Sequence, residues 1–163
     1  LQFKIYMISH FELYLTFENI YLWTNYGIIP FWLMLIFIPN HAITHFFVNS
    51  IIIPLILGSA YIYVVYQTIV LDISIFSIFK LYLNIDELYS LLSSESFLLI
   101  FWLHFISINI FIGSWIVRDA AKYNMSRSFT FLPLILVYFS GPVGLVFYWI
   151  ARIFFAKKIK FHD

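Results

Sequence analysis

Long apolar stretches separated by short polar segments dominate the chain. There are four of them, over about residues 20–38, 46–71, 97–117 and 129–155. Each approaches or exceeds the roughly 20 residues that a helix needs to cross about 30 Å of hydrocarbon. Because lipid offers no partners to backbone N–H and C=O groups, a spanning segment is either a helix or a strand of a closed barrel. Barrel strands alternate apolar and polar residues, whereas these stretches are continuously apolar, so the pattern predicts four transmembrane helices.

Polar residues stand where these helices are expected to end. Pro39 and Asn40 follow the first stretch, and Asp72 follows the second. Arg118 and Asp119 close the third stretch. Charged residues at this place are typical of a helix end at the membrane interface, and we expect these two neighbours to form an ion pair there.

The segment of residues 73–94 is too polar to span a membrane and too apolar to be a free linker. It mixes Ile, Phe and Leu with charged residues such as Lys80 and Glu87, which is typical of an amphipathic helix at the membrane interface. Residues 3–18 are expected to lie similarly. The predicted fold is therefore all-α: a single polytopic membrane domain over residues 1–163, with four transmembrane helices plus interfacial amphipathic segments.

Composition agrees with this fold class and excludes others. Of the 163 residues, 63% are hydrophobic and 10% are charged, and the mean hydropathy is +0.95. Soluble domains have about 25% charged residues, so too few are present here to cover a soluble fold. The net charge of +1 argues against a nucleic-acid-binding protein. The absence of cysteine excludes disulfides and thiolate metal sites.

The distribution of Lys and Arg predicts an orientation. With four crossings, both termini and the segment 73–94 share one side of the membrane. That side holds six basic residues and the other holds three. The six are Lys4, Lys80, Arg152, Lys157, Lys158 and Lys160, and the three are Arg118, Lys122 and Arg127. This excess predicts cytoplasmic termini, or the equivalent side of an organelle membrane.

His104 is the main candidate for chemistry, because it lies inside the third apolar stretch. An ionisable side chain within a membrane helix is a functional-site candidate, and an imidazole is suited to proton transfer. His104 shares a predicted helical face with Ser107 and Phe111, and Asn109 lies on an adjacent face. The alternative interpretation, a neutral histidine that bonds to another helix, remains open.

Two other stretches contain helix-breaking residues near polar ones. Asn25 precedes Pro30 in the first stretch, and Gly141 precedes Pro142 in the fourth. Each proline removes a backbone donor and thus frees the carbonyl four residues earlier. A kinked helix of this kind either borders a cavity or simply packs closely on its neighbour, and both interpretations stay open.

No metal site is expected. His41 and His45 have a spacing that suits a metal on a helix, but no nearby Asp or Glu completes a ligand set.

Three groups of residues resemble a known family, the abscisic-acid-deficient-four-like (neoxanthin-synthase-like) integral membrane proteins. The first group is Asn25, Pro30, Trp32 and Pro39. The second is Trp102-Leu103-His104-Phe105, followed by Phe111-Ile112-Gly113, Trp115 and Asp119. The third is Gly141-Pro142-Val143-Gly144-Leu145 with Tyr148 and Arg152. Two positions depart from the family pattern, which usually has Asp in place of Asn109 and Arg in place of Ser114.

Plant members of that family are implicated in making neoxanthin from violaxanthin. The resemblance therefore implies that the chain binds or isomerises a carotenoid or related isoprenoid, with no cofactor required in principle. The residues expected to be catalytic are His104, as the acid and base, and Asn109. Those expected to contact the substrate are Asn25, Trp32, Trp102, Trp115, Gly141 and Tyr148.

A second hypothesis is non-enzymatic. In it the chain is a membrane subunit or assembly factor, and its intramembrane polar residues only hold helices together. The expected partners are membrane lipid and, in the first hypothesis, the isoprenoid ligand. Assembly into a homo-oligomer is compatible with both hypotheses. A transporter is disfavoured, because so few charges within the apolar stretches leave little for ion coupling.

Overall fold

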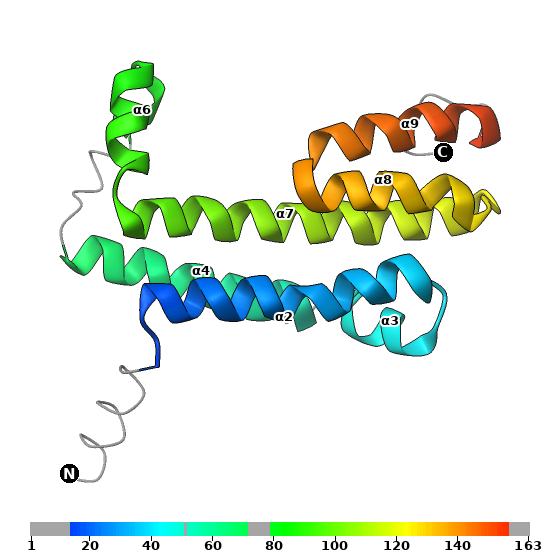
Figure 1. Ribbon diagram of the computed structural model, residues 1–163, viewed down its shortest axis with the longest axis horizontal. Helices are drawn as coiled ribbons and strands as arrows, with labels where there is room; N and C mark the ends of the chain where they lie inside the picture. Colours follow the sequence, from blue (N-terminus) through cyan, green and yellow to red (C-terminus); the bar gives the residue numbers. More distant parts are fainter. Residues whose placement is uncertain (1–13, 51, 72–78, 157–163) are drawn as a thin grey trace, which may run out of the picture. The chain divides into compact units, whose positions relative to one another are not determined.

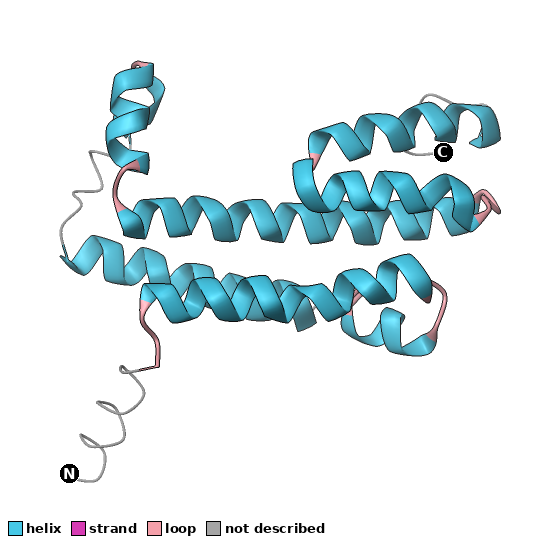
Figure 2. Ribbon diagram, in the orientation of Figure 1, coloured by secondary structure: helices cyan, strands magenta, loops and turns pink. Residues whose placement is uncertain are grey.

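The computed structural model describes residues 14–50, 52–71 and 79–156. Every regular element within these ranges is helical (Figures 1 and 2). In chain order the elements are α2 (Phe17–Phe37), α3 (Ala42–Phe47), α4 (Ile52–Leu71), the short 3-10 turn η1 (Phe79–Tyr82), α6 (Ile85–Leu92), α7 (Glu95–Lys122), α8 (Arg127–Ser140) and α9 (Pro142–Ala156). The prediction of an all-α fold is confirmed for the described residues.

Three stretches of the described chain are long and apolar enough to cross a membrane. They are Phe17–Phe37, Ala42–Val70 and Glu95–Lys122, with mean hydropathies of 1.5, 1.9 and 2.0. They coincide with the first three apolar stretches of the sequence. The second contains two helices, α3 and α4, where the sequence suggested one. These properties are compatible with a membrane protein.

The fourth predicted span, residues 129–155, is not one continuous helix. It consists of α8 and α9, of 14 and 15 residues, and at 1.5 Å per residue the longer one extends only about 22 Å. The two helices lie side by side as a hairpin (Figure 1). The hairpin forms because Gly141 adopts a φ of +50°, which favours glycine, and because Pro142 has no N–H to continue α8.

The predicted interfacial segments are described only in part. Residues 1–13 and 72–78 lie outside the described ranges. The rest of the segment 73–94 contains η1 and α6, and α6 has no buried residue. Asn84 is the N-cap of α6: its Oδ1 accepts a hydrogen bond from the Glu87 N–H at 2.9 Å, an arrangement that favours helix initiation.

The contacts divide the chain into two compact units. Unit 1 comprises Leu1–Gly27 and Leu57–His104, and unit 2 comprises Ile28–Ile56 and Phe105–Asp163. Helices α2, α4 and α7 each contribute residues to both units. In unit 1 a hydrophobic core forms around Ile20, Val64, Leu99 and Leu103.

Unit 2 contains the hairpin of α8 and α9, which depends on a close helix–helix approach at Gly144. A Cβ atom at this position would collide with the Val137 backbone nitrogen, and it would lie 2.5 Å from the Pro133 carbonyl oxygen. Glycine at this place therefore lets the backbones of α8 and α9 come nearly into contact. Such close packing buries the facing sides of both helices, including Leu134 and Val137.

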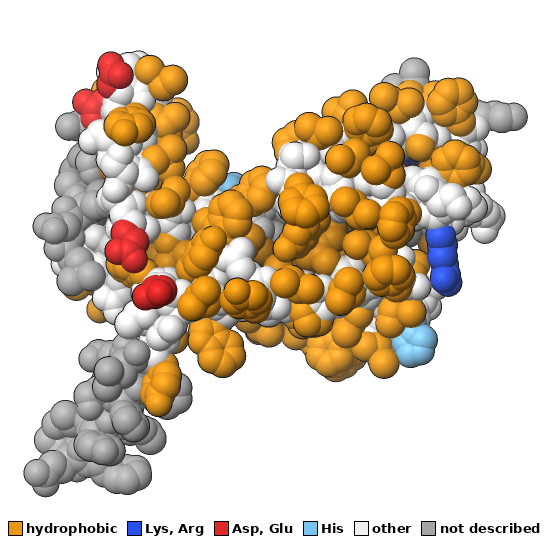
Figure 3. Space-filling model, in the orientation of Figure 1, with side chains coloured by type: hydrophobic (Ala, Val, Ile, Leu, Met, Phe, Trp, Pro, Cys, Tyr) orange, Lys and Arg blue, Asp and Glu red, His pale blue; other side chains and the backbone are white. Residues whose placement is uncertain are grey.

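The outer faces of the helices are strongly apolar. Phe139 of α8 and Phe154 of α9 are 71% and 76% exposed, and hydrophobic side chains cover most of the visible face of this hairpin (Figure 3). A soluble protein rarely exposes so continuous an apolar surface, so these faces require an apolar environment or a partner.

Substitution of Gly144 by alanine is expected to destabilise the protein by about 1–3 kcal/mol, because backbone atoms of α8 cannot move aside as a flexible side chain would. Thermal unfolding of the protein in mild detergent measures the effect. Gly27→Ala and Gly58→Ala are matched controls, since nothing lies within 4 Å of a Cβ at either position, and both are expected to be neutral or slightly stabilising. Equal unfolding temperatures for all three variants would contradict the close approach.

Candidate functional site

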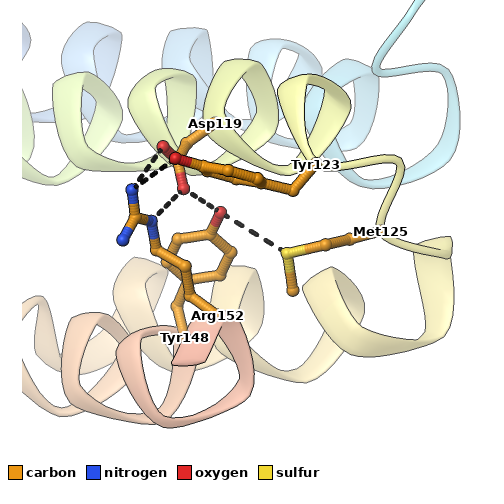
Figure 4. A network of polar contacts seen from close by, with 5 residues as sticks. All are labelled: Asp119, Tyr123, Met125, Tyr148 and Arg152. Carbon is orange, nitrogen blue, oxygen red and sulfur yellow. Dashed lines mark hydrogen bonds and ion pairs between the residues drawn. The ribbon is translucent and has the colours of Figure 1, made fainter. Parts of the chain in front are cut away.

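A buried ion pair joins α9 to α7 in unit 2 (Figure 4). The Nε atom of Arg152 lies 2.6 Å from Oδ2 of Asp119, and the two side chains are only 1% and 8% exposed. A second guanidinium nitrogen, Nη2, lies 3.4 Å from Oδ1. The guanidinium thus contacts both oxygens of the carboxylate, the geometry in which an Arg–carboxylate pair is strongest.

Two tyrosines also make polar contacts with this pair. The Tyr148 hydroxyl donates to Oδ2 of Asp119 at 2.7 Å and lies 3.8 Å from the Met125 sulfur. Nη2 of Arg152 donates to the Tyr123 hydroxyl at 3.1 Å. Because Tyr148 is completely buried, its hydroxyl stabilises the carboxylate in a place that water does not reach.

Aromatic rings enclose the guanidinium group. The central carbon of Arg152 lies 4.9 Å from the Tyr123 ring centroid and 4.8 Å from that of Trp149. Trp115 stacks on Trp149 at 5.9 Å and meets the edge of Tyr148 at 5.6 Å. The predicted site residues Trp115 and Tyr148 therefore lie around the ion pair, where cation–π attraction adds to the charge–charge attraction.

The expected pairing of Asp119 with its neighbour Arg118 was wrong. Arg118 is exposed, and its Nε atom donates to the Ser114 carbonyl at 3.4 Å. Adjacent residues of a helix point to different sides, so Asp119 faces α9 while Arg118 does not. A count of the charged residues could have identified the partner. Asp119 is the only acidic residue between Glu95 and Asp163, and a buried arginine such as Arg152 requires an acidic partner.

Asn109 occupies a different buried place in unit 2. It is 3% exposed, and its Nδ2 atom has no hydrogen-bond partner among the described residues. Its amide lies against Gly141, whose Cβ position would be 2.5 Å from Oδ1. Gly113 is one helical turn further along α7, and the Trp32 ring of α2 packs on it. A Cβ atom on Gly113 would lie 2.9 Å from that ring. Three of the predicted site residues, Asn109, Gly141 and Trp32, are thus buried in this unit.

Smaller polar contacts join other parts of unit 2. The Ser114 hydroxyl donates to Oδ1 of Asn49 at 2.7 Å, and Nδ2 of Asn49 lies 2.9 Å from Nδ1 of His45. Nδ1 of His41 accepts a hydrogen bond from the Ile43 N–H at the start of α3. The two histidines thus have structural contacts. Within the described ranges no three His, Asp or Glu side chains lie close enough to hold a metal ion.

In unit 1 the predicted site residues Asn25 and Trp102 contact each other. The indole N–H of Trp102 donates to Oδ1 of Asn25 at 3.1 Å, and the Tyr21 ring lies 6.2 Å from the Trp102 ring. Nδ2 of Asn25 in turn donates to the Tyr21 carbonyl. The Trp102–Asn25 hydrogen bond joins α2 to α7, and both side chains have hydrogen-bond partners within unit 1.

His104 lines an apolar cavity of about 520 Å³ in unit 1. Its ring lies 6.4 Å from that of Tyr61, and no hydrogen bond of its side chain is present within the described part of the chain. The cavity residues come from α4, η1, α6 and α7. They are Tyr61, Val65, Thr68, Ile69, Tyr82, Leu88, Leu92, Phe97, Ile100, Phe101 and His104.

The two residues predicted to be catalytic have different surroundings. His104 belongs to unit 1 and Asn109 to unit 2. His104 is exposed beside a cavity, whereas Asn109 is buried. Positions five residues apart on one helix do not share a face.

Removal of the carboxylate in Asp119→Ala is expected to destabilise the protein by about 3–5 kcal/mol, because the guanidinium of Arg152 would remain buried without a partner. The double variant Asp119→Leu, Arg152→Met is expected to lose less, since it buries no charge. Unfolding temperatures in mild detergent measure both effects. Arg118→Met is the control for an exposed arginine and is expected to change little. A double variant less stable than Asp119→Ala would refute this account of the pair.

Comparison with known protein families identifies a match. The model of the family described as ABA DEFICIENT 4-like matches residues 19–148. No protein with a curated description and no solved structure matches the chain. The matched range contains Asn25, Trp32, His104, Asn109 and Tyr148, and it ends before Arg152.

Proposed function

Because the chain belongs to the ABA DEFICIENT 4-like family, we propose that it is an integral membrane protein that binds and isomerises an isoprenoid, of which carotenoids are the class that the family resemblance implies. The proposed location is a bacterial inner membrane or a plastid-type membrane with cytoplasmic termini. The proposed binding site is the cavity beside His104 in unit 1.

The observation that carries this proposal is the character of that cavity. Its volume of about 520 Å³ is within the range of about 300–1,000 Å³ common for small-molecule sites. Aromatic rings of Tyr61, Phe97 and Phe101 form part of its lining, and flat rings pack well against a conjugated hydrocarbon chain. A single imidazole in such a lining is the arrangement expected for an apolar ligand that undergoes proton transfer.

The proposed chemistry uses His104 as a proton carrier. For an epoxide substrate, an imidazolium N–H donates its proton to the epoxide oxygen as a C–O bond breaks, which leaves a hydroxyl group. The neutral imidazole that remains then removes a proton from a neighbouring carbon, and the electrons of that C–H bond form the new double bond. The net change is an isomerisation, so neither an oxidant nor a reductant is consumed. An imidazole suits this role because its neutral form accepts a proton and its charged form donates one.

A second candidate function is a non-enzymatic subunit or assembly factor. It is favoured by the polar pairs Asn25–Trp102, Ser114–Asn49 and Asp119–Arg152. Each of these pairs joins segments of the same chain, which is what polar residues do in a membrane protein when they only support packing. His104 distinguishes the two candidates, because its side chain has no such partner among the described residues.

The substitution His104→Gln tests the proposal, because glutamine keeps a polar side chain but cannot transfer a proton. The purified protein is expected to carry a polyene absorption spectrum, and cells with the variant are expected to accumulate the unconverted pigment. Chromatography of pigment extracts measures the conversion. His45→Gln is the matched control, a histidine outside the cavity, and is expected to leave the pigment profile unchanged.

Other outcomes would reject the enzymatic proposal. Identical pigment profiles with the wild-type gene, with His104→Gln and with no gene would remove its support. A colourless protein that co-purifies in mild detergent with one stable protein partner would favour the subunit.

A further inference from the structure

We propose that the break between α8 and α9 is a binding site for a neutral oxygen atom of an apolar ligand, held by the side-chain amide of Asn109. The ligand oxygen would be that of a ketone, hydroxyl or epoxide. The inference does not depend on the chemistry proposed for His104.

The first observation is an unpartnered donor in an apolar place. The Nδ2 atom of Asn109 is buried, and it finds no acceptor among the residues that the structure describes. The whole residue is 3% exposed. A buried N–H without an acceptor costs free energy in a low-dielectric surrounding. Such a group therefore usually donates a hydrogen bond to a water molecule or a ligand.

The second observation is where this amide lies. A Cβ atom on Gly141 would be 2.5 Å from Oδ1 of Asn109 and 3.7 Å from Nδ2. The amide therefore stands directly against the residue at which the chain reverses, and only glycine leaves it room there. Gly141 also has a positive φ of +50°. The break and the amide thus fit each other sterically.

The third observation is that the start of α9 supplies further donors. The first bond of this helix runs from the Leu145 N–H to the Gly141 carbonyl, at 3.2 Å. The N–H groups of Val143 and Gly144 precede it and have no acceptor within α9. Amides in the first turn point out of the helix end and favour a partner with negative partial charge. The first of these two N–H groups, that of Val143, is two residues after Gly141, and Asn109 lies against Gly141.

The surroundings determine the class of ligand. Trp32 packs beside Gly113, one turn along α7 from Asn109, and its ring meets the Tyr138 ring edge-on at 5.5 Å. The guanidinium of Arg152 is already paired with Asp119. Donors without a free positive charge, next to aromatic rings, suit a neutral oxygen acceptor on an apolar body rather than an anion or a cation.

A pair of probes tests the site in the full-length protein purified in mild detergent. One probe is β-ionone labelled with ¹³C at its carbonyl, and the other is the hydrocarbon in which a methylene group replaces that ketone. The wild type is expected to bind the ketone about tenfold more tightly, the effect of one buried hydrogen bond. The infrared carbonyl stretch of the bound ketone is expected to shift to lower frequency.

The substitution Asn109→Leu removes the donor while keeping the size of the side chain. It is expected to abolish both the tenfold preference and the infrared shift. Thr130→Val is the matched control, because it also removes a buried polar group of unit 2 but lies away from the break, and it is expected to keep both. Should Asn109→Leu fail to fold, Asn109→Ala replaces it with the same expectation.

The remaining outcomes overturn the inference. They are equal binding of the two probes by the wild type, an unshifted carbonyl stretch, or a shift that persists in both Asn109 variants. His104→Phe distinguishes this site from the His104 cavity and is expected to retain the shift. A shift lost in His104→Phe but kept in Asn109→Leu would place the ketone at the His104 cavity and refute the site at the break.

Discussion

A carboxylate and a guanidinium in an apolar surrounding each need the other, and unit 2 is built on one such pair. A buried charge that loses its partner costs several kcal/mol, whereas the complete pair roughly offsets its own desolvation. Asp119 and Arg152 come from α7 and α9, which are far apart in the sequence, and their contact fixes one helix against the other. The hydroxyls of Tyr148 and Tyr123 add one hydrogen bond each, to the carboxylate and to the guanidinium.

The ion pair requires that the chain turn back on itself, and the turn depends on two glycines. Gly141 provides the positive φ at which α8 ends, and Gly144 lets α9 approach the α8 backbone. Each glycine removes a different steric obstacle, one in the conformation of the backbone and one between helices. Together they convert an apolar stretch long enough for one spanning helix into a hairpin of two shorter helices.

Several polar side chains inside the described apolar helices have hydrogen-bond partners, and this makes those without one informative. Asn25 is bonded to Trp102 and Ser114 to Asn49, so these residues support packing. The described part of the chain gives neither the His104 imidazole nor the Nδ2 atom of Asn109 a hydrogen bond. One faces a cavity and the other a helix break. A polar group in an apolar surrounding costs free energy. If it makes no hydrogen bond within the protein, it is a candidate for binding or chemistry.

The sequence by itself determined the helical class, the first three apolar stretches and the family, because each follows from local composition or from short patterns of residues. It also identified His104 as unusual, since an ionisable residue in an apolar run is visible without a structure. The tertiary structure alone decided that Asp119 pairs with Arg152 rather than with Arg118, and that residues 129–155 form a hairpin. Proline and glycine within an apolar run predict a kink and a reversal equally well. The choice between them depends on the backbone dihedral angles of Gly141 and on contacts between distant segments. The local pattern of apolar and polar residues determines neither of these.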